Sequence, residues 1–99
     1  MARKNAQNLT LLELSTMSDL EFDILDELYF LIHFNDMKAA LGLSDEDLKP
    51  ILAKMVRKNW LRCYSEPDVE LDPGSIDIEI NFRKYYYLAS KEGLKAHTS

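Results

Sequence analysis

The chain has few of the residues on which cross-links, metal clusters and phosphate loops depend. Its 99 residues include one cysteine, Cys63, and three glycines. A single thiol excludes an internal disulfide and a zinc site built from several thiolates, and we expect it to be a small residue of the core. The glycines do not form a Gly-rich phosphate-binding loop.

Long apolar runs are also lacking. No stretch approaches the roughly 20 apolar residues of a transmembrane helix, and the opening Met-Ala-Arg-Lys-Asn does not resemble a secretory signal. We therefore expect a cytoplasmic protein without a membrane partner. A content of 46% hydrophobic and 29% charged residues is typical of a globular domain. The length fits one domain over 18–99, preceded by an N-terminal arm or short helix over 1–17.

Catalytic patterns are lacking as well. His33 and His97 are isolated, and no serine, cysteine or carboxylate pair has the spacing of a nucleophile with its base. We expect no enzyme, no cofactor and no resident metal. Five acids in the second half of the chain could hold a hard cation, although a solvated acidic turn explains them more simply. They are Asp68, Glu70, Asp72, Asp77 and Glu79.

Positive charge is scarce overall. The net charge is −5, from 12 basic and 17 acidic residues. The acids concentrate in 18–34 and 62–82, whereas 83–99 is the most basic segment. Duplex DNA attracts clustered Lys and Arg side chains, so any contact with DNA would depend on local basic patches.

Apolar spacing predicts a first helix from Ser18. Ser18-Asp19-Leu20-Glu21 is a capping box, and we expect the helix to continue through 28–34. That segment is apolar nearly all round, which predicts burial on more than one side. A central helix of a small bundle and a dimer contact both explain it.

Two further helices follow. The second is expected over 36–41, with Asn35 as its N-cap and Gly42 at its C′ position. The third is expected over 47–58, where apolar residues recur at i, i+3, i+4 and i+7. Its buried residues would be Leu48, Ile51, Leu52 and Met55, and Asn59 would end it.

Pro50 decides where the third helix begins. With Ser44 as the N-cap, Pro50 would lie in the helix interior and cost roughly 3 kcal/mol. A start near Asp47 would place Pro50 in the first turn, where no amide donor is needed. We therefore predict the later start.

From Trp60 the apolar period changes to two. Ile76, Ile78, Ile80 and Phe82 alternate with polar residues, which predicts a half-buried strand. The turn signal at 72–75 would join it to 61–71 in a long hairpin, in which Glu70 would face Asp77 and Asp68 would face Glu79. Ser90 can cap a last short helix over 91–97, which Gly93 weakens.

Several of these residues carry a family resemblance. Leu-Gly-Leu-Ser at 41–44, followed by Leu48, Met55 and Asn59, is similar to the helix-turn-helix register of winged-helix repressors. Pro-Ile-Leu at 50–52 and Arg-Lys-Tyr-Tyr-Tyr-Leu-Ala-Ser-Lys-Glu-Gly at 83–93 resemble the PadR branch of those repressors. The chain is more distantly similar to MarR-like regulators, and the resemblance covers roughly 37–96.

The resemblance implies an α+β, mostly α fold: a three-helix bundle, a long β-hairpin wing and a short C-terminal helix. It also implies a transcriptional regulator that binds duplex DNA through helix 47–58 and the base of the wing. The candidate contacts are basic side chains on these two elements. They are Lys49, Lys54, Arg57, Lys58, Arg83 and Lys84.

The charge distribution favours an alternative. Three acids at 45–47 begin the third helix, where a phosphate would otherwise be attracted. A winged-helix module that binds a protein with a basic surface, and not DNA, would tolerate them. A homodimer is a further expectation, with contacts through apolar residues of the N-terminal segment and the first helix. These residues are Leu9, Leu11, Leu12, Phe30 and Phe34.

Overall fold

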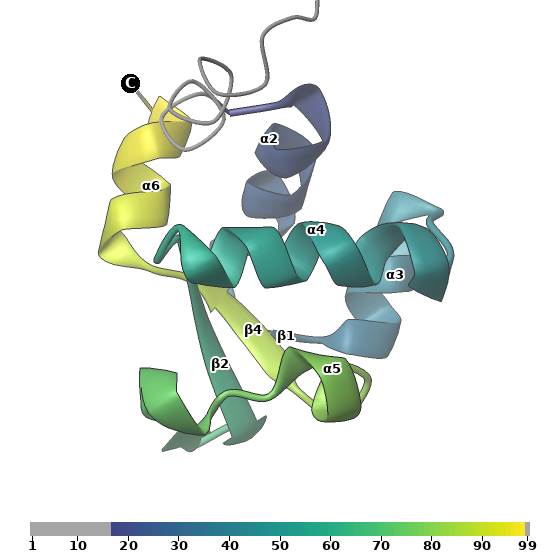
Figure 1. Cartoon of the computed structure of the whole chain (residues 1–99). Coiled ribbons are helices and arrows are strands. Elements are labelled where there is room, and N and C mark those ends of the chain that lie inside the picture. The colour runs from purple at the N-terminus through teal and green to yellow at the C-terminus, as the bar shows by residue number, and fades with distance from the viewer. Residues whose placement is uncertain (1–16, 99) are drawn as a thin grey trace, which may run out of the picture.

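The structure is a computed structural model that describes residues 17–98. Figure 1 shows helix α4 crossing the molecule, with α2 and α6 on one side and the sheet and α5 on the other. The helices are α2 (Asp19–Glu27), α3 (Phe34–Leu41), α4 (Asp45–Arg57), α5 (Ile78–Asn81) and α6 (Lys91–Thr98), with a 3-10 turn η1 (Pro73–Ser75). The strands are β1 (Ile32–His33), β2 (Leu61–Glu66), β3 (Val69–Glu70) and β4 (Tyr86–Ala89).

This mixed α+β, mostly helical fold confirms the coarse fold class. Within residues 17–98, no helix has the length and apolarity needed to cross a bilayer. The leucines at 9, 11 and 12, and the predicted arm apart from Met17, lie outside the described residues.

Helix α2 begins as predicted but ends early. The Ser18 hydroxyl accepts from the Glu21 amide at 3.1 Å, and the Glu21 carboxylate accepts from the Ser18 amide at 3.0 Å. The helix stops at Glu27, and the Leu28 carbonyl then accepts from the Ala89 amide at 2.9 Å. The prediction of a helix through 28–34 was wrong, because its apolar residues enter a strand and the next helix. A short apolar run does not distinguish these outcomes.

For α3 and α4, the predicted ends are confirmed, but the predicted starts were wrong. Gly42 and Asn59 have φ values of 67° and 64°, the left-handed conformation that ends α3 and α4. Helix α3 is capped by His33 and not by Asn35, since His33 Nδ1 accepts from the Asn35 amide at 3.1 Å.

Gly93 lies in α6, where its amide donates to the capping Ser90 hydroxyl at 3.0 Å.

Helix α4 begins at Asp45, two residues before the predicted start. The Ser44 hydroxyl accepts from the Asp47 amide at 3.1 Å, which places Pro50 inside the helix. The three acids of the first turn favour the positive end of the helix dipole, and three residues of α4 are fully buried. The Ser44 cap, the acids at the positive end of the helix dipole and the buried side chains together offset the cost of Pro50. The buried residues are Leu48, Leu52 and Met55.

The sheet is antiparallel, with strand order β1-β4-β2-β3. The central pair, β2 and β4, places Cys63 opposite Tyr87 and Leu61 opposite Ala89. Strand β1 adds to the other side of β4, with Ile32 opposite Tyr87. The first and last parts of the domain therefore meet in one sheet.

The prediction of a long hairpin was wrong. The chain turns at 67–68, and β2 pairs with the short β3. Glu70 of β3 lies opposite Tyr64 of β2, and not opposite Asp77, and its carboxylate accepts from Arg62. Within the segment 76–82, Ile78–Asn81 forms α5, with the Asp77 carboxylate accepting from the Ile80 amide at 3.2 Å. Ile78 and Phe82 are buried while Ile80 is 74% exposed, so the burial follows i, i+4 spacing. Apolar residues at four alternate positions fit a strand, and the pair four residues apart also fits a helix, so the pattern alone did not decide between them.

The three consecutive tyrosines do not form one stacking surface, as expected for neighbours on opposite faces of a strand. Tyr85 and Tyr87 are buried, whereas Tyr86 is half-buried. The Tyr87 hydroxyl donates to the Phe82 carbonyl at 2.9 Å, and burial raises its pKa.

Cys63 is expected to react only when the domain opens. Its side chain is fully buried, and burial raises the pKa of the thiol to about 12, so almost no thiolate exists at neutral pH. Because it is the only cysteine, its alkylation by iodoacetamide should follow the fraction of unfolded chain in a urea titration. Rapid modification of the folded protein at neutral pH would contradict this burial.

Candidate interaction surfaces

The face of α4 that was expected to contact DNA carries Lys49, Ala53 and Arg57 in one row, and another segment of the chain covers part of it. Lys49 Nζ lies 2.8 Å from a carboxylate oxygen of Glu79 and 5.3 Å from the ring centre of Phe82. Further along α4, Ala53 and Arg57 line a shallow hollow of about 250 Å³ together with 76–79. The segment that was expected to form a wing strand therefore borders this row and brings two acids to it.

The start of α4 is an ion-pair cluster. Asp45 lies 2.7 Å from Lys38 Nζ and 2.6 Å from Arg83 Nε. The hydrogen bonds from Lys38 and then Arg83 lower the pKa of the Asp45 carboxyl. The Arg83 guanidinium also lies 4.6 Å from the Phe82 ring centre. Arg83 therefore neutralises an acid of its own chain.

Lys58 is part of the core and not of the surface. Its side chain is 1% exposed, and Nζ donates to both carboxylate oxygens of Glu21 at 3.1 and 2.9 Å. The ammonium also lies 4.2 Å from the ring centre of Trp60. Burial alone would raise the pKa of Glu21, but the Ser18 amide and the Lys58 ammonium together lower it. Lys58 was therefore wrongly assigned to DNA contact.

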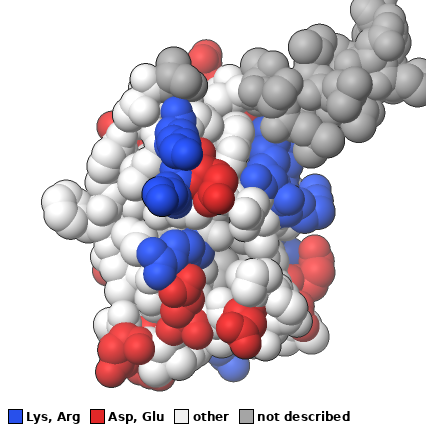
Figure 2. All heavy atoms as spheres, turned by 90° about the vertical axis from the view of Figure 1, so that its left-hand side faces the viewer, with Lys and Arg blue, Asp and Glu red and all other residues white. Residues whose placement is uncertain are grey.

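Three of the six candidate cations remain without an ion pair among residues 17–98: Lys54, Arg57 and Lys84. Lys54 and Arg57 lie on α4, but Lys84 lies in the turn before β4. On the face shown in Figure 2, Lys and Arg side chains lie beside Asp and Glu side chains, and acids gather toward the end that carries the β2–β3 turn and α5. This face has no continuous basic field.

A second surface combines aromatic and acidic side chains on α2 and the turn after it. Phe22 and Tyr29 are nearly half exposed and Phe30 is 82% exposed. Asp23 and Asp26 are exposed on the same helix. We name these five residues the aromatic–acidic surface. Phe34 is fully buried against the core, so its assignment to a partner contact was wrong.

Helix α6 holds part of this surface in place. The His97 ring stacks on Phe22 with centroids 4.2 Å apart, and His97 Nδ1 lies 2.7 Å from the Tyr29 hydroxyl. Phe22 and Tyr29 were not among the site residues predicted from the sequence. The combination of aromatic residues with the acidic segment 18–34 was the available signal.

The five acids considered for a cation are dispersed. Glu70 pairs with Arg62, whose Nε lies 2.8 Å from it, and Glu79 pairs with Lys49. Over the described part of the chain, no group of three or more His, Cys, Asp or Glu residues could hold a metal ion. The arrangement gives the cation hypothesis no support.

Comparisons with protein-family models, with curated proteins and with solved structures find no match to this chain.

Proposed function

We propose that the chain is a non-enzymatic winged-helix domain that binds a protein partner through its aromatic–acidic surface. The order of elements supports the fold: α2, β1, α3 and α4 are followed by β2 and β4, and β1 pairs with β4. A helix-turn-helix followed by a β-ribbon has this arrangement. The corner at 42–44 between α3 and α4 also supports the PadR-like resemblance.

The observation that carries the proposed function is the exposure of Phe30 within an acidic setting. Aromatic residues are enriched at protein–protein interfaces, and an exposed apolar patch rimmed by polar residues marks such a site. Asp23 and Asp26 on the adjacent helix would attract a partner with basic side chains and disfavour wrong partners. The partner is therefore a protein whose surface combines Lys or Arg with an apolar pocket.

A second copy of this chain is a poorer partner for this surface. A two-fold contact between identical patches would bring their aspartates close together. Like charges that face each other across an interface weaken it. The expected homodimer, if it forms, would need a different surface.

Site-specific photocrosslinking tests the proposal. A photoreactive p-benzoylphenylalanine replaces Phe30 in one variant and Ile80 in another, since both side chains are strongly exposed and Ile80 lies on α5. We expect one defined protein adduct from position 30 and none of the same mass from position 80. Reversing the charges with Asp23→Lys/Asp26→Lys should reduce the adduct at least about tenfold, as expected for two steering charges.

Three outcomes of the crosslinking would contradict the proposal. Identical adducts from positions 30 and 80, or an adduct that is insensitive to charge reversal, would mean that this surface does not recognise a partner. An adduct from position 30 with a second copy of the chain would overturn the basic partner.

Duplex DNA is the second candidate, favoured by the exposed Arg57 on α4. Its recognition row includes Lys49, which is paired with Glu79, and the whole chain carries a net charge of −5. We therefore expect no mobility shift of a random-sequence duplex at low salt, where electrostatic attraction is strongest. A shift that disappears in Lys54→Glu/Arg57→Glu would instead establish DNA binding and displace the protein partner as the first function.

A further inference from the structure

The hollow between α4 and the segment 76–79 is too small for most ligands but fits the side chains of another surface. Its volume is about 250 Å³, below the roughly 300 to 1,000 Å³ that is usual for small-molecule sites. Apolar side chains line it from both sides: Ala53 and Val56 from α4, and Ile76 and Ile78 from the other segment. Packed apolar side chains of this kind form the core of protein–protein contacts.

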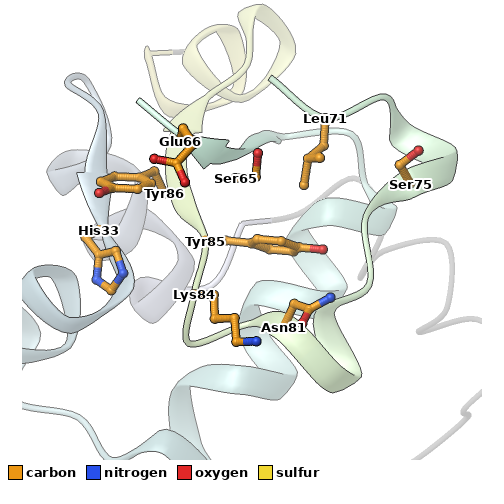
Figure 3. A pocket seen from close by; sticks show the side chains of 9 residues that line it. All are labelled: His33, Ser65, Glu66, Leu71, Ser75, Asn81, Lys84, Tyr85 and Tyr86. Atoms are coloured by element: carbon orange, nitrogen blue, oxygen red, sulfur yellow. The ribbon is translucent and has the colours of Figure 1, made fainter. Parts of the chain in front are cut away.

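The segment on the second side of the hollow is held by the rest of the domain. The Tyr85 ring extends across a larger hollow in Figure 3, and its hydroxyl accepts from the Asp77 amide at 2.9 Å. The next residue, Ile78, is buried in the core. The hollow is therefore formed before any partner arrives, which lowers the cost of binding.

The two sides of the hollow carry opposite charges. Arg57 is exposed on the α4 side, whereas Asp77 and Glu79 are exposed on the other side. Within residues 17–98, neither Arg57 nor Asp77 forms an ion pair. Glu79 pairs with Lys49, but its side chain remains 77% exposed. We name the lining of this hollow, cationic along α4 and acidic along 76–79, the split-charge face.

The split-charge face is complementary to itself. A two-fold axis that runs along the hollow, in the plane of contact, places the α4 side of one copy against the 76–79 side of the other. Arg57 of each copy then meets the acids of the other copy, and the two apolar linings pack together. The match does not depend on how far apart the two sides are, because the axis exchanges them. The aromatic–acidic surface lacks this property, since both of its charged residues are acids.

We propose that a second copy of this chain binds at the split-charge face, so that the protein forms a two-fold dimer. The face lies between α4 and α5, whereas α2 lies on the other side of α4 in Figure 1. The dimer therefore leaves the aromatic–acidic surface free for its own partner. It also covers Arg57, so duplex DNA would compete with the second copy for α4.

Sedimentation equilibrium of the full chain tests the dimer, at concentrations up to about 1 mM so that weak association is included. We expect the wild type to change from monomer to dimer as the concentration rises. Arg57→Glu places acids against acids twice in each dimer, and Glu79→Arg places cations against cations. Each should raise the dissociation constant at least about tenfold. The double variant Arg57→Glu/Glu79→Arg exchanges the two charges and should recover most of the loss.

Two control variants change the net charge by the same amounts at exposed side chains that do not line the hollow. Lys95→Glu on α6 matches Arg57→Glu, and Asp36→Arg on α3 matches Glu79→Arg. Both controls should leave the dimer unchanged. A chain that stays monomeric at every concentration would overturn the proposal, as would controls that weaken the dimer equally or a double variant no better than the single ones. A dimer lost in Phe30→Ser would place the contact on the aromatic–acidic surface and overturn it too.

Discussion

Replacing Lys58 with methionine is expected to lower the free energy of unfolding by about 3 to 5 kcal/mol, the cost of leaving a buried charge without its partner. Glu21 is 2% exposed in the ion pair, so water cannot replace the lost ammonium. The Lys58–Trp60 contact, 4.2 Å from the ring centre, would be lost too. A loss of this size is a large fraction of the stability of a small domain.

Urea unfolding, followed by the fluorescence of Trp60, measures this effect. Lys54→Met is the matched control, because Lys54 lies one turn earlier on the same helix and is partly exposed. Its effect should stay within about 1 kcal/mol. The double variant Glu21→Gln/Lys58→Met should recover much of the loss, since it removes both buried charges together. A Lys58→Met loss no larger than that of Lys54→Met would show that the pair is not buried.

The pH dependence supplies an independent check. The pKa of Glu21 is lowered in the folded protein, so its stabilising contribution is present above the ordinary value of 4.5 and is lost as the pH falls through the lowered pKa. In Lys58→Met, the carboxyl loses the ammonium that lowers its pKa while burial still opposes its charge, so its pKa rises relative to the wild type and protonation relieves the folded state. The stability difference between the two proteins should therefore narrow in acid. A difference that is constant with pH would rule out Glu21 as its source.

The fate of Lys58 shows which part of a site can be predicted from sequence. Lys58 continues the helical spacing of basic residues on α4, but its partner Glu21 is 37 positions away and comes within reach only in the folded chain. Local features were predictable: the capping box at Ser18 and the left-handed ends at Gly42 and Asn59 depend on bonds within one turn.

The segments that could not be predicted are those whose apolar spacing fits both a helix and a strand. Ile78 and Phe82 satisfy a helix as well as a strand, and tertiary contact with α4 decides for the helix. This choice also creates the candidate sites. With Ile78–Asn81 folded as α5, Glu79 reaches Lys49, a contact that a plain hairpin would not have indicated.

Gly93→Ala should destabilise the domain, although alanine normally stabilises a helix by about 1 kcal/mol relative to glycine. A Cβ at position 93 would clash with the Trp60 carbonyl oxygen and lie 3.2 Å from Leu25 Cδ2. The Trp60 carbonyl is itself fixed, because it accepts from the Ser90 amide at 2.8 Å. Helix α6 would have to move away, and we expect a net loss of about 1 to 3 kcal/mol.

Gly74→Ala is the matched control, since no atom lies within 4 Å of the added Cβ and the effect should stay within about 0.5 kcal/mol. The consequence of Gly93→Ala also reaches the aromatic–acidic surface. His97 of α6 stacks on Phe22 and contacts the Tyr29 hydroxyl, so a displaced α6 should expose both rings and weaken photocrosslinking from position 30. A Gly93→Ala protein that is more stable than the wild type would mean that α6 does not pack this closely on Trp60, and that the surface is held by other contacts.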